Sequence, residues 1–189
     1  MTTNRAASSR LERSVHAEVE IVLHPIPTAD SKPYIIVFGP DQQLWFCESG
    51  TSKIGRMNPG NGSFIEFDTP TPNCEPRAMV THPDGSIWFV ETKANALGRM
   101  DAQGRVTEWP VKTPDASLRG VTVAPDGDLW FTENFSNKIG RMAPDGKVIG
   151  EYAIPVDGCG ARAIVAIPDG RLFFSAHDAG AIGEVIPRR

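Results

Sequence analysis

The sequence predicts an all-β fold of the propeller type. A short apolar phrase occurs four times, and its first residues lie 43, 42 and 43 positions apart. The copies are Leu44–Phe46, Ile87–Phe89, Leu129–Phe131 and Leu172–Phe174. A glycine stands eleven positions after the start of each copy, and no window carries a sustained helical apolar period. A repeat of about 42 residues, made of short apolar runs and turn residues, matches one four-stranded propeller blade.

The third repeat shows the strands and turns of a single blade. Its four predicted strands are Arg119–Ala124, Leu129–Glu133, Lys138–Ala143 and Lys147–Ile154. The first of these strands alternates β-branched residues with others, which is typical of a strand. Two turn segments contain a proline, which fixes φ, followed by an Asp-Gly pair that favours a hairpin. We therefore expect four short antiparallel strands in each of four repeats.

The two ends of the chain predict how the propeller is completed. Residues 1–15 are polar and without a period, so we expect a flexible tail before a propeller domain at 16–189. Val19–Ile26 has the pattern of a fourth strand, and Ala181–Ile186 has that of a third strand. If the first strand pairs with the last, it completes the last blade and removes two free sheet edges.

Three arrangements are consistent with these ends. Pairing within one chain gives a four-bladed ring, whereas pairing between chains gives a larger ring, most simply an eight-bladed homodimer. A third alternative is that the sequence is a piece of a longer propeller. We favour the homodimer, because the bulky Trp-Phe phrase suits a large ring and exchange between identical chains is a low-cost route to a dimer.

Composition and charge exclude several classes of function. The formal net charge is −4, so the chain lacks an overall basic surface for nucleic acid. No apolar run approaches the ~18 residues of a membrane helix, and residues 1–15 lack the apolar core of a secretory signal. The three cysteines lack metal-type spacing, which favours reduced thiols. We expect a cytoplasmic protein that binds a small-molecule ligand, and neither nucleic acid nor a membrane.

The text of the repeat is specific enough to suggest a family. Gly127–Glu133, Asn137–Met142 and Glu151–Pro155 closely resemble the repeat of the virginiamycin B lyase family, and the resemblance extends over about residues 19–187. It implies a propeller enzyme, seven-bladed in the family, that linearises cyclic type B streptogramins by elimination at an ester linkage. In that reaction Mg²⁺ polarises the substrate and a histidine takes a proton.

The resemblance also implies site residues. In the family, a Glu-Pro-His phrase supplies a metal carboxylate and the base, and a Trp-Phe-x-Glu phrase supplies a second carboxylate 14 residues after that histidine. Glu75 and Glu91 match the two carboxylates and are the expected Mg²⁺ ligands, while Arg77 stands at the catalytic histidine position. Arginine stays protonated and cannot act as a base near neutral pH. His177, beside Asp178, is the best remaining base, with an ordinary loop histidine as the alternative interpretation.

The repeats place a second set of polar residues at equivalent positions. Arg77, Arg119 and Arg162 start the predicted innermost strands, where the first repeat has Tyr34. Glu48, Glu91 and Glu133 end the next strands. One interpretation is a ring of Arg and Glu around the central mouth that binds an anionic or polar ligand. The alternative is an ion-pair network between blades, with Glu75 a solvated loop carboxylate.

Three functions follow from these observations. The first is a lyase-like enzyme that opens a cyclic ester with Mg²⁺ held by Glu75 and Glu91. The second is a non-catalytic propeller whose mouth binds a small ligand or a partner segment. The third is another propeller enzyme, such as a lactone hydrolase with a divalent metal. The presence of a titratable base near the ligand separates the first from the second.

Overall fold

The computed structural model describes residues 12–15 and 18–188, and every regular element in that part of the chain is a β-strand. The expected tail, residues 1–15, lies outside the described residues except for 12–15. None of the described residues forms a helix that could cross a membrane. The all-β prediction is confirmed.

Four radial antiparallel sheets follow one another along the chain, and we call them blades 1 to 4. Blade 1 consists of β3 (Pro33–Phe38), β4 (Leu44–Glu48), β5 (Lys53–Met57) and β6 (Phe64–Asp68). Blade 2 consists of β7 (Pro76–Thr81), β8 (Ile87–Glu91), β9 (Ala96–Met100) and β10 (Val106–Pro110). Blade 3 consists of β11 (Leu118–Val123), β12 (Leu129–Glu133), β13 (Lys138–Met142) and β14 (Val148–Ala153). Blade 4 has three strands, β15 (Ala161–Ala166), β16 (Leu172–Ala176) and β17 (Ala181–Val185).

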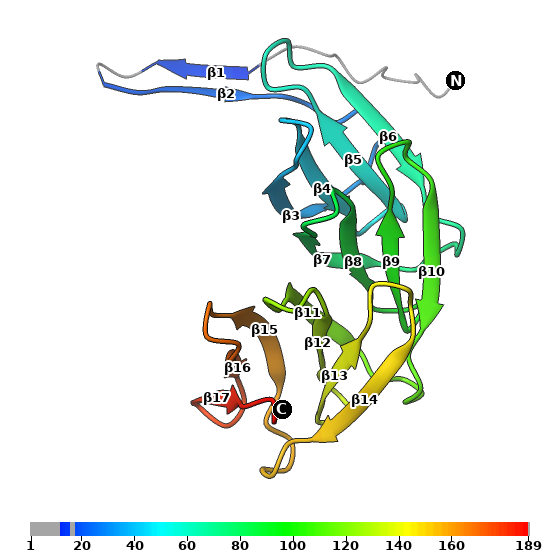
Figure 1. Ribbon diagram of the computed structural model, residues 1–189. Helices are drawn as coiled ribbons and strands as arrows, with labels where there is room; N and C mark the ends of the chain where they lie inside the picture. Colours follow the sequence, from blue (N-terminus) through cyan, green and yellow to red (C-terminus); the bar gives the residue numbers. More distant parts are fainter. Residues whose placement is uncertain (1–11, 16–17, 189) are drawn as a thin grey trace, which may run out of the picture.

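The blades form an open arc rather than a closed ring (Figure 1). The first strands β3, β7, β11 and β15 lie on the inner, concave side, and β6, β10 and β14 lie on the outer side. The four strands predicted for the third repeat are confirmed, and their ends differ by no more than one residue from the observed bounds.

The repeated apolar phrase builds the core between neighbouring blades. Trp88 of blade 2 packs in one buried cluster with Val121 and Phe131 of blade 3. Equivalent clusters join blade 1 to blade 2 and blade 3 to blade 4. Each tryptophan of the repeated phrase also stacks on an aromatic ring from the fourth strand of its own blade. Trp88, for example, stacks on Trp109 with 5.2 Å between ring centroids. Burial of such large apolar surfaces is the main force that holds consecutive blades together.

The repeated glycine faces the phenylalanine of the phrase across the second and third strands. Gly98 pairs with Phe89, and a Cβ on Gly98 would collide with the Phe89 ring. The same relation holds in the other three blades, at Gly55, Gly140 and Gly183. The glycine therefore makes room for a ring that packs closely against the strand.

In blades 1 to 3 an arginine follows that glycine, and it has a structural role. Arg141 lies 5.2 Å above the Trp130 ring, and its guanidinium donates to Asp128 at 2.6 Å. Blade 4 exchanges the two charges, since Glu184 takes the arginine position and accepts a hydrogen bond from Arg171 at 3.0 Å. Blade 4 thus keeps an ion pair at these two positions, but the acidic and the basic residue are exchanged.

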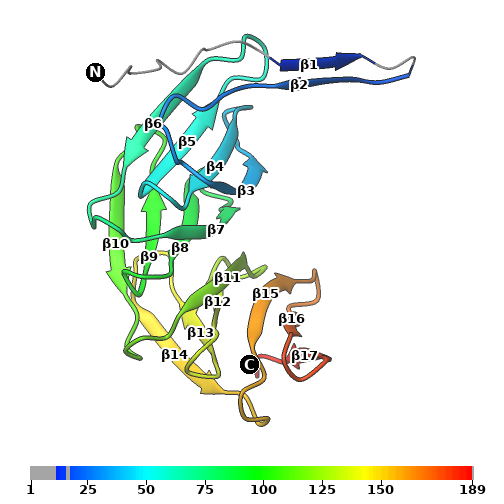
Figure 2. The same cartoon turned by 180° about the vertical axis from the view of Figure 1, so that it is seen from behind.

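The expected closure within one chain does not occur. The segment predicted as a fourth strand contains β2 (Glu20–Leu23), which pairs with β1 (Glu12–Val15) and not with β17. Figure 2 shows this hairpin projecting away from blade 1, at the opposite end of the arc from blade 4. In the described part of the chain, the two ends of the arc do not meet and no four-bladed ring is formed.

Candidate ligand-binding site

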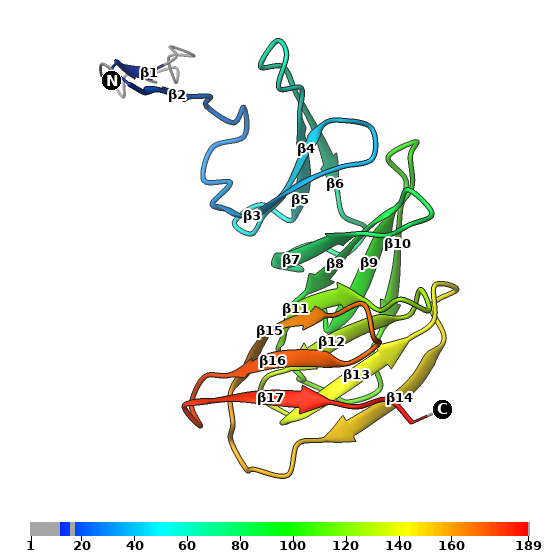
Figure 3. The ribbon, with the colours of Figure 1, turned by 60° about the vertical axis from the view of Figure 1, so that its left-hand side comes forward.

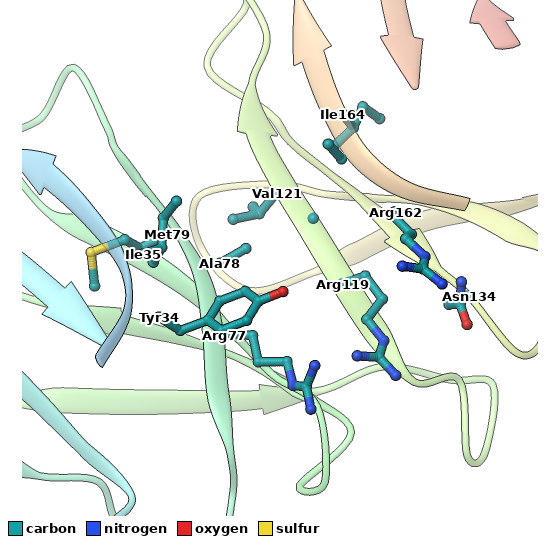
Figure 4. A pocket seen from close by; sticks show the side chains of 12 residues that line it. Tyr34, Ile35, Arg77, Ala78, Met79, Arg119, Val121, Asn134, Arg162 and Ile164 are labelled. Carbon is teal, nitrogen blue, oxygen red and sulfur yellow. The ribbon is translucent and has the colours of Figure 1, made fainter. Parts of the chain in front are cut away.

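The concave side of the arc carries a pocket of about 430 Å³ that draws residues from the first strand of every blade. Tyr34, Arg77, Arg119 and Arg162, which the repeats predict to share one mouth, all line it (Figure 4). Its remaining lining comes mainly from small or apolar residues of the same strands: Ile35, Ala78, Met79, Gly120, Val121, Ala163 and Ile164. This volume falls within the range of small-molecule sites.

Local sequence explains how the arginines reach the pocket. In blades 2, 3 and 4 each arginine is followed by a small residue and then by an apolar one, as in Arg119-Gly120-Val121. A register shift interrupts each first strand at this point, between Leu118 and Val121 in blade 3. Gly120 is required there, because a Cβ would collide with the carbonyl oxygen of Arg162 on the neighbouring strand β15. Close approach of the first strands therefore brings the guanidinium groups into one pocket.

Arg77 is already engaged by its neighbours. Its guanidinium makes an ion pair with Glu75, and Nε donates to Oε1 of that carboxylate at 3.0 Å. The same guanidinium lies 5.5 Å from the centre of the Tyr34 ring. Hydrogen bonds from Arg77 and the charge of Lys93 outweigh burial and lower the pKa of Glu75. Arg77 is thus fixed as one wall of the pocket.

Arg119 and Arg162 differ from Arg77, because neither has a carboxylate partner among the described residues. Arg119 is half-buried, and burial together with the charges of Arg77 and Arg162 lowers its pKa. Three cations around a small pocket repel one another, and an anion placed between them would relieve that repulsion. The pocket is therefore suited to a ligand with a negative group.

A second pocket of about 330 Å³ adjoins the first and shares Arg77 and Arg119 with it. Glu75, Lys93 and Phe135 are among its other lining residues. Glu75 therefore sits at the rim of the arginine site and not free in solvent.

The glutamates that end the second strands do not lie at the mouth. Glu48, Glu91 and Glu133 are fully buried, and none of them lines either pocket that holds the arginines. Burial raises the pKa of Glu48 to about 7 and raises that of Glu133 as well. The expected ring of Arg and Glu is thus wrong in its glutamate half, because the side chains at the ends of these strands point into the blades.

Glu91 is the most isolated of the three buried glutamates. Thr51 donates to Glu48 at 3.0 Å and Ser136 donates to Glu133 at 2.7 Å, but Ala94 takes that position in blade 2. Among the described residues, no partner lies within hydrogen-bond geometry of either carboxylate oxygen of Glu91, although Cys74 and Glu108 are close enough to affect its pKa. Burial, and then the charge of Glu108, raise the pKa of Glu91 to about 8. Burial in the blade thus favours the neutral form of the Glu91 carboxyl group and raises its pKa.

With this geometry described, comparison with known proteins identifies the family. A sequence model of the virginiamycin B lyase family matches residues 6–188. The chain belongs to the virginiamycin B lyase family.

Solved lyases have the same fold over most of this chain. A catalytically inactive histidine-to-alanine variant of virginiamycin B lyase from Staphylococcus aureus, solved with quinupristin, is 30% identical at a TM-score of 0.85. That match covers 95% of this chain and 60% of the lyase. A streptogramin B lyase structure is also 30% identical, with a TM-score of 0.79, and the match covers 90% of this chain and 59% of the other. This chain thus spans about 60% of the length of the lyases.

A more distant likeness extends to a protein of another description. Regucalcin, a calcium-binding protein from Agrobacterium tumefaciens, is 20% identical at a TM-score of 0.59, covering 81% of this chain and 60% of its own, which shows the fold alone. Among curated protein sequences none matches the chain.

The carboxylates of this lyase-family chain do not fit Mg²⁺ in the arrangement seen. Mg²⁺ requires charged or neutral oxygen ligands and retained waters in an accessible site. Glu91 is fully buried and its pKa is raised, whereas Glu75 is held by Arg77 and Lys93, whose Nζ lies 3.5 Å from it. In the described part of the chain, no three His, Cys, Asp or Glu side chains gather as a metal site. Mg²⁺ on Glu75 and Glu91 stays a prediction from the resemblance.

His177 is the candidate that the sequence offers for the missing histidine base of the family. It is exposed and its Nδ1 lies 2.6 Å from Oδ1 of Asp178, but it lines neither arginine pocket.

The three cysteines are free and buried, and burial raises the pKa of Cys74 to about 12, so these thiols are unreactive.

Sequence reasoning missed two contributors to the pocket. Asn134 lines it from the loop after β12, and the small residues after each arginine let the first strands approach. The repeated order of arginine, small residue and apolar residue was the signal for the second contributor. The position of Asn134 directly after Glu133 gave no comparable signal.

Proposed function

We propose that this virginiamycin B lyase family member binds a small amphipathic anion, such as an aryl or alkyl carboxylate, in the arginine-lined pocket. The observation that supports this most directly is that Arg119 and Arg162 line one pocket and have no carboxylate partner within the described part of the chain. Guanidinium groups bind carboxylates through charge-assisted, often bidentate hydrogen bonds. The apolar floor formed by Met79, Val121 and Ile164 would take the body of the ligand.

A titration with phenylacetate tests this proposal. We expect saturable binding to the wild type by calorimetry, and weaker binding of inorganic phosphate, which has no apolar body. Arg119→Ala should weaken phenylacetate binding by about tenfold or more, since a hydrogen bond to a charged group contributes about 1.5–3 kcal/mol. Arg105→Ala removes the same charge from an exposed turn outside the pocket and should leave binding unchanged. Equal affinities of the two variants would overturn the proposal.

The elimination reaction of the relatives is the second candidate. It is favoured by the 30% identity to a solved lyase and by the Glu75-Pro76 phrase at the pocket rim. Against it, arginine holds the position of the base, and the protonated guanidinium cannot accept the substrate proton. Turnover of quinupristin with and without Mg²⁺ separates the two functions. We expect none; ring opening that requires Mg²⁺ and is lost in Glu75→Gln would favour the lyase.

A further inference from the structure

A histidine in the turn after β7 joins blade 2 to blade 3. His82 is buried, and its Nε2 lies 2.9 Å from the carbonyl oxygen of Gly127, in the turn between β11 and β12. Because a carbonyl oxygen only accepts hydrogen bonds, Nε2 carries a proton and donates it. The other ring nitrogen, Nδ1, lies 3.2 Å from the amide nitrogen of Asp84 and 2.8 Å from its Oδ1. The imidazole ring therefore fills the space between the two turns and bonds to both.

Blade 3 lacks this histidine at the equivalent position. Ala124 stands 42 positions after His82, and Gly170 of blade 4 stands 43 positions after Gly127. The turns that hold the two glycines are alike, since their φ angles are 90° and 93° and each glycine donates its amide three residues back, at 2.9 and 3.0 Å. The backbone between blades 3 and 4 thus repeats that between blades 2 and 3, but without the ring.

A pocket of about 410 Å³ lies where a histidine ring would be. Its lining includes the counterparts of the three residues that surround that ring in blades 2 and 3, namely Ala124, Asp126 and Gly170. A Cβ on Gly127 would lie 3.8 Å from Nε2 of His82, whereas a Cβ on Gly170 would have no neighbouring atom within 4 Å. The alanine therefore leaves open the space that the histidine fills one blade earlier.

This pocket is separate from the arginine-lined one. It lies between blades 3 and 4, which pack side by side (Figure 3), and the two pockets share no lining residue. Ala124 follows the end of β11, whereas Arg119 lies near its start. A ligand in the second pocket would therefore not compete with an anion held by the arginines.

The groups around this pocket favour a ligand without a strong charge. Asp126 pairs with Arg141 at 2.9 Å and Asp169 pairs with Arg171 at 2.8 Å, so the carboxylates that line the pocket have cationic partners. In the described part of the chain, no protein group donates to the carbonyl oxygen of Gly170. The pocket thus offers an acceptor that a ligand can use, beside apolar walls from Trp130 and Pro168.

We propose that this pocket is a second ligand site, which takes a small nitrogen heteroaromatic ring of the imidazole class. The N–H of the ring donates to the carbonyl oxygen of Gly170, as Nε2 of His82 does to Gly127. Its second nitrogen meets Asp126, whose amide can donate and whose carboxylate can accept, as Asp84 does beside Nδ1 of His82. The site takes from solution the ring that blade 2 carries on its own chain.

A chemical-shift titration of the wild type with imidazole tests the site. At pH 8, where an imidazole ring is mostly unprotonated, the amide signals of Asp126 and Arg171 should shift together and saturate, while that of Arg119 should not move. 1-Methylimidazole has no N–H to give to Gly170, so it should bind about threefold more weakly or worse. No saturable shift at this pocket, or equal binding of the two rings, would overturn the proposal.

Two substitutions test the same site from the side of the protein. Ala124→His should abolish imidazole binding and raise the midpoint of thermal unfolding, because the chain then supplies the ring itself. Ala102→His, in the exposed turn between β9 and β10, is the matched control and should bind imidazole as the wild type does. His82→Ala should open a second site of this kind, so imidazole should raise its unfolding midpoint more than that of the wild type.

Undiminished imidazole binding by a folded Ala124→His variant would show that the ring lies elsewhere and would overturn the proposal. The comparison of imidazole with 1-methylimidazole uses the wild type alone, so it decides the matter even where a variant fails to fold.

Discussion

At the scale of single residues, the repeat is maintained by pairs that face each other across two strands. The Gly98–Phe89 pair shows this most clearly, because the absence of a side chain on one strand is what allows the ring on the other to pack closely against it. The phenylalanine of the phrase and the glycine eleven positions after the start of the phrase therefore form one packing unit. A substitution of either residue should disturb the same core.

Gly98→Ala should destabilise the protein by about 1–3 kcal/mol, because an extra methyl group forces a buried ring from its place. Chemical denaturation measures the change. Gly60→Ala is the control, since Gly60 lies in an exposed turn where a Cβ would meet only the side chain of Asn58 at 3.2 Å. A Gly98→Ala variant as stable as the control would show that the ring position is not fixed by the glycine.

Glu91 should make stability depend on pH. Its pKa is raised from 4.5 to about 8, so between these values the unfolded chain is ionised at Glu91 while the folded chain keeps its proton. The stabilising contribution is complete below about pH 4.5 and is lost as pH rises to about 8. Glu91→Gln should therefore be more stable than wild type at pH 8 by more than about 1 kcal/mol, since a tenfold change in proton affinity is worth about 1.4 kcal/mol.

The free energy of unfolding of both proteins between pH 4.5 and 8 checks this expectation. Glu48, with a pKa of about 7, contributes to the same interval in both, so the difference between the two curves is the quantity that matters. Ala94→Ser, which restores the hydroxyl found in blades 1 and 3, should reduce the loss at high pH. Parallel curves for wild type and Glu91→Gln would contradict a neutral buried Glu91.

At the scale of strands and blades, polar side chains tie neighbouring first strands together. The Thr132 hydroxyl donates to the carbonyl oxygen of Arg162 at 2.6 Å and accepts from the amide of Gly120 at 2.9 Å. It thereby joins blade 3 to blade 4 at the point where two pocket arginines begin their strands. Thr92 makes a comparable bond to the carbonyl oxygen of Leu118 at 2.8 Å, between blades 2 and 3.

Thr132→Val should cost about 1–3 kcal/mol, because it keeps the shape but leaves the buried amide of Gly120 and the partly buried carbonyl of Arg162 without this partner. It should also weaken phenylacetate binding, since the strand that carries Arg162 loses its support. Thermal denaturation and the same titration check both effects, and Thr107→Val on the exposed face of β10 is the control. A variant with normal stability would mean that the bridge is dispensable.

Strands and the repeat could be predicted because they depend on local periodicity. The turn at Pro125–Asp128 and the alternation in the first strand place each element to within a residue. The direction of Glu91 could not be predicted in this way. It pairs with Pro76, next to Arg77, so the two residues are close in register, but a shift between Pro76 and Met79 sends neighbouring side chains to different sides. The spacing of the motifs thus predicts which backbone segments are adjacent, but it does not predict which side chains surround the Glu91 carboxylate.

At the scale of the whole molecule, the open arc explains why some polar residues meet and others do not. The concave side brings four equivalent first-strand positions together, which is why Tyr34 and the three arginines share one pocket. The hairpin could not be predicted from the sequence of β2 alone, since its strand pattern does not specify which edge it joins.

The central claim is that the arginine-lined pocket binds an amphipathic anion, and a crystal structure with 4-bromophenylacetate tests it most directly. The account predicts an anomalous bromine peak over Met79, Val121 and Ile164, with the carboxylate between the guanidinium groups of Arg119 and Arg162. Arg119→Ala should abolish both features. An empty pocket in a crystal of the wild type that holds the ligand elsewhere, or a carboxylate turned away from both arginines, would contradict the account.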